Sequence, residues 1–252
     1  MNESLLEATA LNKRFNGINA LDDFYASIRT GEILGLIGPN GAGKTTLFNV
    51  LTRFILSDNG KVVLKGKDIT GAASYKIANM GISRTFQNLR LIRQISVLEN
   101  VMLAFKNQPG ENLINVFFRH KKVKQAEKKN KTKALELLSY AGLSDKAYDR
   151  ANDLSYGQQK LLTIVCCLAS DGDLILFDEP VAGVNPVMID KILKIIADLP
   201  RQGKSAIIIE HNMNAINQIC DRVIAMDAGK KICEGTPEEV RNDPNVIESY
   251  LT

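Results

Sequence analysis

The sequence lacks an apolar run long enough to cross a lipid bilayer. A membrane-spanning helix needs about 18–20 consecutive apolar residues, whereas the longest apolar run here extends from Leu161 to Ala169 and is bounded by Lys160 and Asp171. The first four residues also lack the basic flank and the apolar segment of a secretory signal. We therefore expect a chain that does not span a membrane by itself and that stays in the cytoplasm.

Cysteine is scarce, and its spacing fits neither a disulfide framework nor a zinc site. Cys166 and Cys167 are adjacent within the apolar run, and Cys220 and Cys233 do not form a C-x-x-C pair. Structural disulfides are also rare in the cytoplasm. The four cysteines are therefore predicted to be buried, reduced thiols.

The chain has little excess charge of either sign, with a formal net charge of +4 over 252 residues. A nucleic-acid-binding domain is expected to have a pI above about 9 and a clustered basic face, so we expect no nucleic-acid partner. One segment, residues 119–133, is locally basic, with Glu127 as its only acidic residue. A solvated helical face is favoured over a contact with anionic lipid or RNA. The basic members are Arg119, His120, Lys121, Lys122, Lys124, Lys128, Lys129, Lys131 and Lys133.

Short apolar runs followed by turns and helical segments recur along the chain, which is typical of an α/β fold. Ile33–Ile37, Leu174–Phe177 and Ala206–Ile209 are predicted to be buried strands of one largely parallel sheet. More alternating segments at 5–11, 24–28 and 61–64 are separated by turn signals and predict an antiparallel layer beside that sheet.

Helical patterns fill the middle and the end of the chain. Residues 97–142 show no clear strand and fit helices, including one at 133–141. Thr236 and Pro237 are predicted to begin a C-terminal helix, because threonine can cap a helix and proline suits its first position. A central helical block is thus expected to interrupt the α/β core.

A complete phosphate-binding motif follows the first buried strand. Residues 38–45 are Gly-Pro-Asn-Gly-Ala-Gly-Lys-Thr, which matches G-x-x-x-x-G-K-[ST], and a helix-compatible segment comes next. Glycines let backbone N–H groups curl around phosphate oxygens, and the helix N-terminus adds a favourable dipole. Lys44 can neutralise the β- and γ-phosphates, and the Thr45 hydroxyl can ligate Mg²⁺. A ligand-free turn would explain the glycines but not a lysine placed directly before Thr45.

Acidic residues emerge at the same edge of the predicted sheet. Asp178 and Glu179 follow the strand Leu174–Phe177, and parallel sheets bind ligands at the carboxyl ends of their strands. Asp178 is placed to hold the Mg²⁺ shell, and Glu179 to polarise a water for in-line attack on the γ-phosphate. His211 follows another predicted strand and can donate a hydrogen bond to that phosphate, although an isolated histidine is more often structural.

A segment between these sites carries a family resemblance. Residues 154–160, Leu-Ser-Tyr-Gly-Gln-Gln-Lys, open an apolar helix and resemble the signature motif of ABC ATPases. The resemblance extends from Leu5 to the C-terminus. The signature completes the family's set, in the family's order, with Lys44, Gln87, Asp178, Glu179 and His211.

The resemblance implies an α/β fold of the P-loop NTPase (RecA-like) type, with an antiparallel β layer and an inserted helical subdomain. Residues 1–252 would form a single ABC ATPase domain. Within it, residues 1–88 and 153–252 would form the nucleotide-binding core with the antiparallel layer. Residues 89–152 would form the helical signature subdomain with the basic insertion.

The resemblance also assigns residues to an ATP site shared between two subunits. Phe15 would stack on adenine, and Gln87 would link the metal and the attacking water to the helical block. Ser155 and Gly157 would contact the γ-phosphate of ATP bound to the opposite subunit. The implied nucleotide-binding residues are Phe15, Asn40, Gly41, Ala42, Gly43, Lys44, Thr45, Thr46, Ser155, Gly157 and Gln158.

The resemblance assigns catalysis and metal binding to a smaller set of side chains. ATP and Mg²⁺ are the implied cofactors. The implied metal ligands are Thr45, Gln87 and Asp178. The implied catalytic residues are Glu179, His211, Lys44 and Gln87.

Three positions depart from the commonest pattern of the family. Tyr156 stands where a second glycine is usual, Asn185 where aspartate is usual, and Phe15 where tyrosine is usual. None of these departures removes a catalytic charge, and the phenylalanine ring keeps the stacking role. In segments 84–88, 154–159, 182–186 and 235–240, and in its basic insertion, the chain is similar to the ATPases of branched-chain amino acid importers.

The resemblance implies a transport ATPase at the cytoplasmic face of the membrane. It would pair with a second copy of itself or a paralogous subunit and power import through a separate permease, with an extracytoplasmic substrate-binding protein involved indirectly. Hydrophobic amino acids are the expected cargo, and a urea or amide importer and a lipopolysaccharide exporter remain alternatives. A non-transport ABC ATPase would typically carry tandem ATPase domains or a long coiled coil. A phosphate-loop switch or kinase would not need the signature segment.

Overall fold

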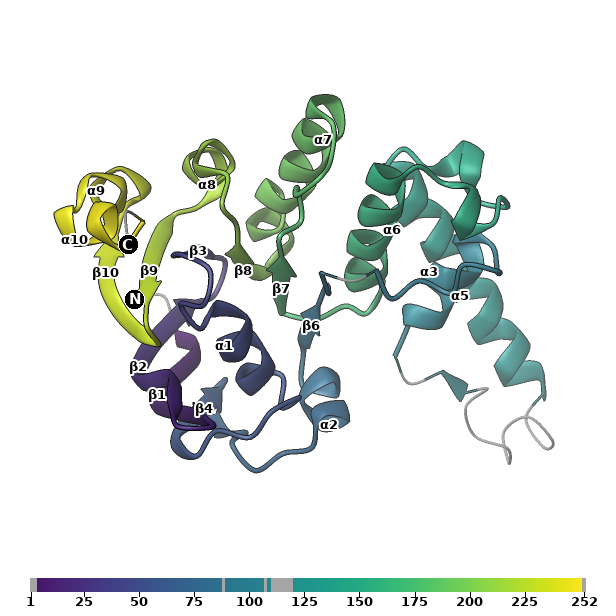
Figure 1. The fold of residues 1–252 in the computed structure, drawn as a ribbon. Coiled ribbons are helices and arrows are strands. Elements are labelled where there is room, and N and C mark those ends of the chain that lie inside the picture. Colours follow the sequence, from purple (N-terminus) through teal and green to yellow (C-terminus); the bar gives the residue numbers. More distant parts are fainter. Residues whose placement is uncertain (1–3, 88, 107, 110–119, 251–252) are drawn as a thin grey trace. The chain divides into compact units, whose positions relative to one another are not determined.

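The computed structural model describes residues 4–87, 89–106, 108–109 and 120–250 (Figure 1). Predictions that concern residues 1–3, Asn88 and Arg119 lie outside the described residues. The chain divides into two compact units. The first consists of residues 1–84, 173–182 and 193–252, and the second of residues 85–172 and 183–192.

The main sheet belongs to the first unit, and its strands follow the order β10-β9-β3-β8-β7-β6. Strands β3 (Ile33–Ile37), β7 (Leu174–Asp178) and β8 (Ser205–Ile209) are buried along their whole length, as their continuous apolar runs predicted. Neighbouring strands from β9 to β6 pair in parallel, which confirms the largely parallel sheet, and β10 joins antiparallel. The remaining strands are β6 (Ile82–Arg84), β9 (Arg222–Asp227) and β10 (Lys230–Gly235).

The predicted antiparallel layer is also confirmed, with strands in the order β2-β1-β4-β5. Strands β1 and β2 are longer than the predicted segments. Asn16 and Gly17, with φ of 45° and 89°, connect them in a two-residue turn that suits a hairpin. The strands are β1 (Ser4–Phe15), β2 (Ile18–Arg29), β4 (Asn59–Leu64) and β5 (Lys67–Asp68).

One hydrophobic core joins this layer, the main sheet and helix α1 (Lys44–Leu51). Phe24 of β2, Leu34 of β3 and Phe48 of α1 belong to the same buried cluster. Burying a side chain of this size stabilises a fold by about 1.5–3 kcal/mol. The core thus fixes both the strand before the phosphate-binding motif and the helix after it.

Short helices complete the first unit. Helix α9 begins as predicted, because the Thr236 side chain accepts the backbone N–H of Glu239 and Pro237 lies in the first turn. Helix α7 (Pro186–Ala197) begins in the second unit and ends in the first. The other helices are α2 (Ser74–Asn79), α8 (Met213–Ile219), α9 (Pro237–Asn242) and α10 (Pro244–Ser249), with a 3₁₀ turn at Pro200–Gln202.

The second unit is helical, as predicted for the middle of the chain. Helix α3 packs against both α5 and α6. The elements are α3 (Val97–Ala104), α5 (His120–Tyr140) and α6 (Tyr156–Ala169), with 3₁₀ turns at Ser144–Lys146 and Ala151–Asp153. Residues 153–172 lie in this unit, whereas the boundaries inferred from the sequence place them with the core. Among the described residues, every helix is too short or too polar to span a bilayer.

The basic segment lies on the first turns of α5. Its lysine side chains from Lys121 to Lys133 are exposed, in agreement with the predicted solvated face. The opposite side of the helix is apolar, with Val123, Ala134 and Leu138 buried. This one-sided burial explains why so polar a helix packs stably.

All four cysteines are free, as predicted. Cys167 and Cys220 are buried, and burial raises the pKa of each thiol to about 12. Both thiols are therefore protonated and unreactive near neutral pH. Cys166 and Cys233 are only partly buried, so the prediction of burial is wrong for these two.

Candidate functional site

The phosphate-binding motif folds into a tight loop between β3 and α1. Gly38, Gly41 and Gly43 have φ of 144°, 86° and 102°, which side chains of L-residues disfavour. A Cβ on Gly38 would lie 2.1 Å from the Met226 carbonyl oxygen, and one on Gly43 would lie 2.3 Å from that of Ala20. Glycine is therefore required at both ends of the loop, because the backbone passes so close to neighbouring strands.

Lys44 is held inside this loop. Its Nζ atom donates hydrogen bonds to the carbonyl oxygens of Gly38, at 2.7 Å, and Pro39, at 2.8 Å. Burial lowers the pKa of Lys44, and the negative charges of Glu179 and Asp178 act in the opposite direction. The ammonium thus lies in a site that already favours anionic groups around it.

The start of α1 offers donors beside the lysine. The N–H of Leu47 donates to the Gly43 carbonyl at 2.8 Å. The N–H groups that precede Leu47 have no acceptor within the helix. They are the groups that bind an anion at a helix N-terminus, where the helix dipole is also favourable. Thr45 is exposed at this end and Thr46 is half-buried.

Asp178 ends β7 and forms a buried ion pair. Its Oδ2 atom lies 3.0 Å from Nη2 of Arg84, and both side chains are 5% exposed. Arg84 also donates to Oδ1 of Asn49 on α1, at 2.7 Å. The arginine therefore joins β6, β7 and α1 at the loop. We did not predict Arg84, because its strand is only three residues long and its partner Asp178 lies 94 residues away in the sequence.

Glu179 has a strained backbone, with φ of 50°. Such values are uncommon outside glycine and cluster at functional sites. Its N–H donates to the Ile209 carbonyl at 3.0 Å, which ties it to β8. Its Oε1 atom lies 3.3 Å from Nε2 of His211, and the two side chains are 23% and 40% exposed. The structure thus brings the predicted carboxylate and histidine together at a solvent-accessible position.

Glu210 is a site residue that sequence reasoning missed. It is buried, with 3% exposure. Its Oε1 atom accepts the N–H of Val181 at 2.9 Å, and its Oε2 atom accepts that of His211 at 3.2 Å. One carboxylate therefore links the loop after β7 to the loop after β8. The signal was an acidic residue between a buried strand and His211.

The signature residues lie at the start of α6 in the second unit. Ser155 caps the helix, since its Oγ accepts the N–H of Gln158, while Oε1 of Gln158 accepts the N–H of Ser155 at 2.9 Å. Gly157 packs closely, and a Cβ there would lie 3.1 Å from the Met188 side chain. Tyr156 is 49% exposed. These residues have a structural role in the helix start in addition to any role in binding.

The remaining predicted residues lie on loops and strand ends. Phe15 ends β1, is 42% exposed, and has Nζ of Lys13 at 5.3 Å from its ring centre. Asn185 directly precedes α7, and its Oδ1 accepts the N–H of Met188 at 3.0 Å, as the side chain of a helix N-cap does. Gln87 follows β6 along the chain and belongs to the second unit.

The oxygen donors near the loop fit magnesium. Mg²⁺ is commonly held by one or two protein oxygens, with water and substrate phosphates completing its octahedron. Asp178 and the Thr45 hydroxyl are donors of that kind. The described residues contain no cluster of three or more His, Cys, Asp or Glu that could hold a metal. Asp178 and Thr45 could therefore supply two of the oxygens that Mg²⁺ prefers.

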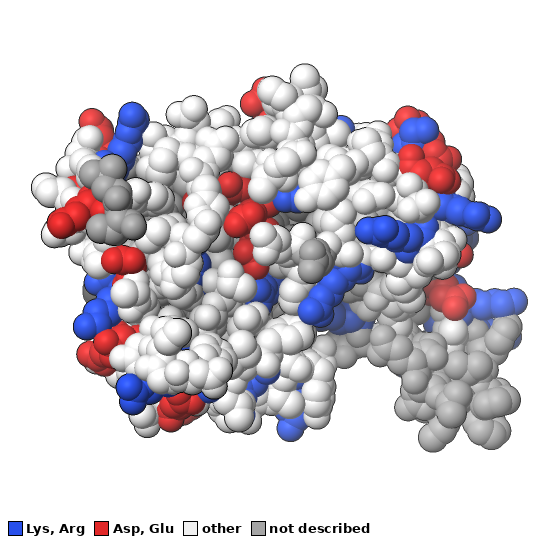
Figure 2. Space-filling model, viewed as in Figure 1, with Lys and Arg blue, Asp and Glu red and all other residues white. Residues whose placement is uncertain are grey.

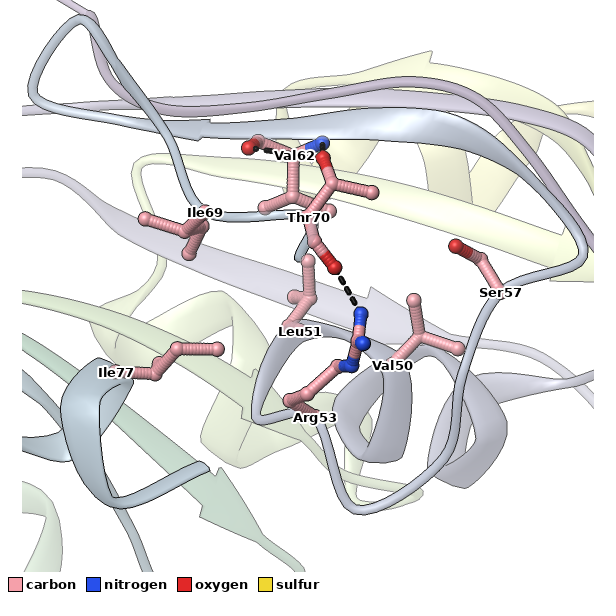
Figure 3. A pocket seen from close by; sticks show the side chains of 8 residues that line it. All are labelled: Val50, Leu51, Arg53, Ser57, Val62, Ile69, Thr70 and Ile77. Carbon is pink, nitrogen blue, oxygen red and sulfur yellow. Dashed lines mark hydrogen bonds between the residues drawn. The ribbon is translucent and has the colours of Figure 1, made fainter. Parts of the chain in front are cut away.

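A small pocket lies beside the C-terminal end of α1 (Figure 3). Arg53 donates a hydrogen bond to the Thr70 carbonyl across it. The Thr70 hydroxyl accepts the N–H of Val62 at 2.9 Å. None of the predicted site residues lines this pocket. The residues that line it are Val50, Leu51, Arg53, Ser57, Val62, Ile69, Thr70 and Ile77.

The surface charge is mixed. On the face drawn in Figure 2, basic side chains are interrupted by acidic and uncharged ones over the described residues. Nucleic-acid-binding faces instead carry a continuous basic patch. Over the described residues, this face shows no continuous basic patch.

Residues 21–182 match the family model described as ABC transporter. The chain belongs to this family. A second model, described as branched-chain amino acid ATP-binding cassette transporter, matches residues 230–251 of the cassette. The chain is thus an ABC-family ATPase, and the phosphate-binding loop, Asp178 and Glu179 all lie within the matched ABC segment.

Curated relatives align with the cassette over its whole length. It is 36% identical to the high-affinity branched-chain amino acid transport ATP-binding protein LivG of Salmonella typhimurium, covering 100% of this chain and 99% of LivG. It is 34% identical to BraF of Pseudomonas aeruginosa, with the same coverage of both chains. BraF carries the same functional description as LivG.

Solved structures of ABC cassettes have the same fold. A nucleotide-free ATP-binding cassette from an ABC transporter superposes with a TM-score of 0.85 at 34% identity, covering 99% of this chain and 100% of the other. The ADP conformation of an ATP-binding cassette gives a TM-score of 0.84 at 33% identity, covering 99% of each chain. The predicted α/β P-loop fold is therefore confirmed.

Proposed function

We propose that this cassette binds MgATP on the loop Gly38–Thr45 and hydrolyses it with Glu179 as the general base. One observation carries this proposal. The loop after β3, with the buried Lys44, lies close to the carboxylates of Asp178 and Glu179 at the end of β7. Lys44 already lies in the field of Asp178 and Glu179. A phosphate group would provide the acceptors that the Gly38 and Pro39 carbonyls provide here.

Each side chain then has a chemical role. Lys44 neutralises the β- and γ-phosphates, while Thr45, Asp178 and Gln87 hold the Mg²⁺ shell. The metal, when bound, withdraws charge from the phosphate oxygens. Glu179 takes a proton from the attacking water, and His211 donates a hydrogen bond to the γ-phosphate.

The contacts that fix Glu179 support its assignment as the base. Tertiary contacts hold the residue in the left-handed region, through the Ile209 carbonyl and the neighbouring Glu210 bridge. A base fixed in this way loses little freedom on reaching the transition state. The Glu179 carboxylate points toward His211, whose Nε2 atom lies 3.3 Å from Oε1 of Glu179.

A second copy of the cassette, or a paralogous subunit, completes the site in this proposal. Ser155, Gly157 and Gln158 lie at a helix N-terminus, which suits contact with an anionic phosphate of the facing subunit. Phe15 offers an exposed aromatic ring for adenine. ATP would then be bound between two copies and would hold them together.

The cargo we propose is a branched-chain amino acid, moved inward through a separate permease. The names of LivG and BraF and the match of residues 230–251 support this cargo. The cassette would lie at the cytoplasmic face of the membrane, with an extracytoplasmic binding protein delivering the substrate. The permease and that binding protein would select the cargo.

Affinity purification from native membranes tests the proposal. A tagged cassette is expected to recover a polytopic membrane protein, and deletion of the cassette gene should abolish high-affinity leucine uptake. A cassette with Glu179→Gln should recover the same partner but fail to restore uptake. Recovery of ribosomes or DNA would contradict the proposed membrane partner. A loss of urea uptake with leucine uptake intact would contradict the proposed cargo.

A further inference from the structure

The phosphate-binding loop is tied to the C-terminal end of the chain. The backbone N–H of Gly38 donates a hydrogen bond to the hydroxyl oxygen of Tyr250, at 2.8 Å, across 212 residues of sequence. Tyr250 directly follows helix α10, and its own N–H donates to the Ile247 carbonyl at 3.2 Å. The C-terminal segment that matches the second family model thus reaches the first glycine of the loop.

Tyr250 is 47% exposed, and the helix that precedes it is firmly packed. Asp243 caps α10, because its side chain accepts the N–H groups of Asn245 and Val246. Val246 is 4% exposed, and α10 packs against α9 and β10. Ser249 is also buried, and its hydroxyl donates to the Val246 carbonyl at 2.7 Å. The tyrosine is therefore presented to the loop by a packed helix.

Gly38 connects this tyrosine to the lysine of the loop. Its N–H binds Tyr250, and its carbonyl accepts Nζ of Lys44 at 2.7 Å. Gly38 has a φ of 144°, and the Met226 carbonyl leaves no room for a side chain at this position. A buried backbone N–H in such a position needs a hydrogen-bond acceptor. The Tyr250 hydroxyl provides it.

We propose that Tyr250 is a positioning residue for the nucleotide site. By accepting the Gly38 N–H, it holds the loop in the conformation that presents Lys44 and the N-terminus of α1 to phosphate. The C-terminal helices thereby set the affinity for ATP without touching the nucleotide. This inference rests on the proposed assignment of the loop Gly38–Thr45 as the nucleotide site.

The test replaces Tyr250 by phenylalanine, which removes the hydroxyl and keeps the ring. We expect the Kd and KM for MgATP to rise about threefold to tenfold, as for the loss of one hydrogen bond, while kcat changes less than about twofold. In the nucleotide-free protein, hydrogen exchange of the Gly38 amide should become about tenfold faster. Tyr75→Phe is the matched control, at a tyrosine that is 64% exposed on α2 of the same unit. It should change neither the affinity for MgATP nor the exchange rate of the Gly38 amide.

Two results would overturn the proposal. The first is an unchanged ATP affinity and an unchanged Gly38 exchange rate in Tyr250→Phe. The second is a silent Tyr250→Phe with a defective Tyr250→Leu, because ring packing and not the hydroxyl would then hold the loop. Failure of the nucleotide-site assignment looks different, since Lys44→Ala would then leave ATP affinity unchanged while Gly38 exchange still reports the Tyr250 bond.

Discussion

Substituting Glu179 with glutamine should reduce the rate of ATP hydrolysis by about a thousandfold, within the usual range for loss of a general base. Glutamine has nearly the same shape and keeps an oxygen within reach of His211, which lies 3.3 Å from the carboxylate in the native structure. It cannot accept the proton of the attacking water. The affinity for MgATP should therefore be unchanged or increased, because uncleaved nucleotide stays bound.

Steady-state turnover and equilibrium binding of MgATP measure the two halves of this prediction. Glu136→Gln on α5 is the matched control, since that carboxylate is exposed and is not among the predicted site residues. It should hydrolyse ATP at the native rate. Size-exclusion chromatography with MgATP should show a stable dimer only for Glu179→Gln. Normal hydrolysis by Glu179→Gln would mean that another group is the base.

Lys44→Ala should weaken MgATP binding by about a hundredfold. Hydrogen bonds to charged groups contribute about 1.5–3 kcal/mol, and this lysine is expected to contact two phosphates. The folded state should tolerate the change. Burial already lowers the pKa of Lys44, which means that the buried charge is unfavourable to the fold without a ligand.

Titration with a fluorescent ATP analogue measures the loss, and a thermal melt checks the fold. Lys67→Ala on β5 is the control, because that lysine is exposed and lies in the antiparallel layer. Its affinity should match the native protein. If Lys44→Ala bound and hydrolysed ATP as the native chain does, the assignment of the phosphate loop would be wrong.

Local sequence patterns were sufficient for the strands that carry the site. β3, β7 and β8 are continuous apolar runs buried on both faces, so their pattern alone identified them. β6 escaped prediction because it is only three residues long and ends in a polar arginine. It exists through parallel pairing with β7, which no local pattern encodes.

The sequence predicted the chemical groups of the site better than the contacts that hold them in place. Motif spacing identified Lys44 and Glu179, but the left-handed backbone of Glu179 depends on tertiary contacts. Arg84 and Tyr250 reach their partners across 94 and 212 residues, and such contacts leave no periodic signal. By contrast, the spacing of Ser155 and Gln158 is a capping-box pattern that the sequence already contained.

The central claim is that Lys44 of one subunit and Ser155 of another bind the same ATP. Both variants are made in a Glu179→Gln background. A homodimer of Lys44→Ala, or one of Ser155→Arg, would have both of its ATP sites damaged. Neither variant alone should therefore dimerise with MgATP. A mixture forms heterodimers with both lesions in one site and an intact second site. Because Ser155 also caps α6, circular dichroism must first show that Ser155→Arg is folded.

Sedimentation velocity of the differently tagged variants, mixed with MgATP, is the most direct measurement. The shared site predicts a dimer in the mixture and monomers in each separate sample. If Ser155 instead contacted the ATP of its own subunit, the heterodimer would have one lesion in each site and mixing would restore nothing. Monomers alone in a mixture of folded variants would contradict the shared site.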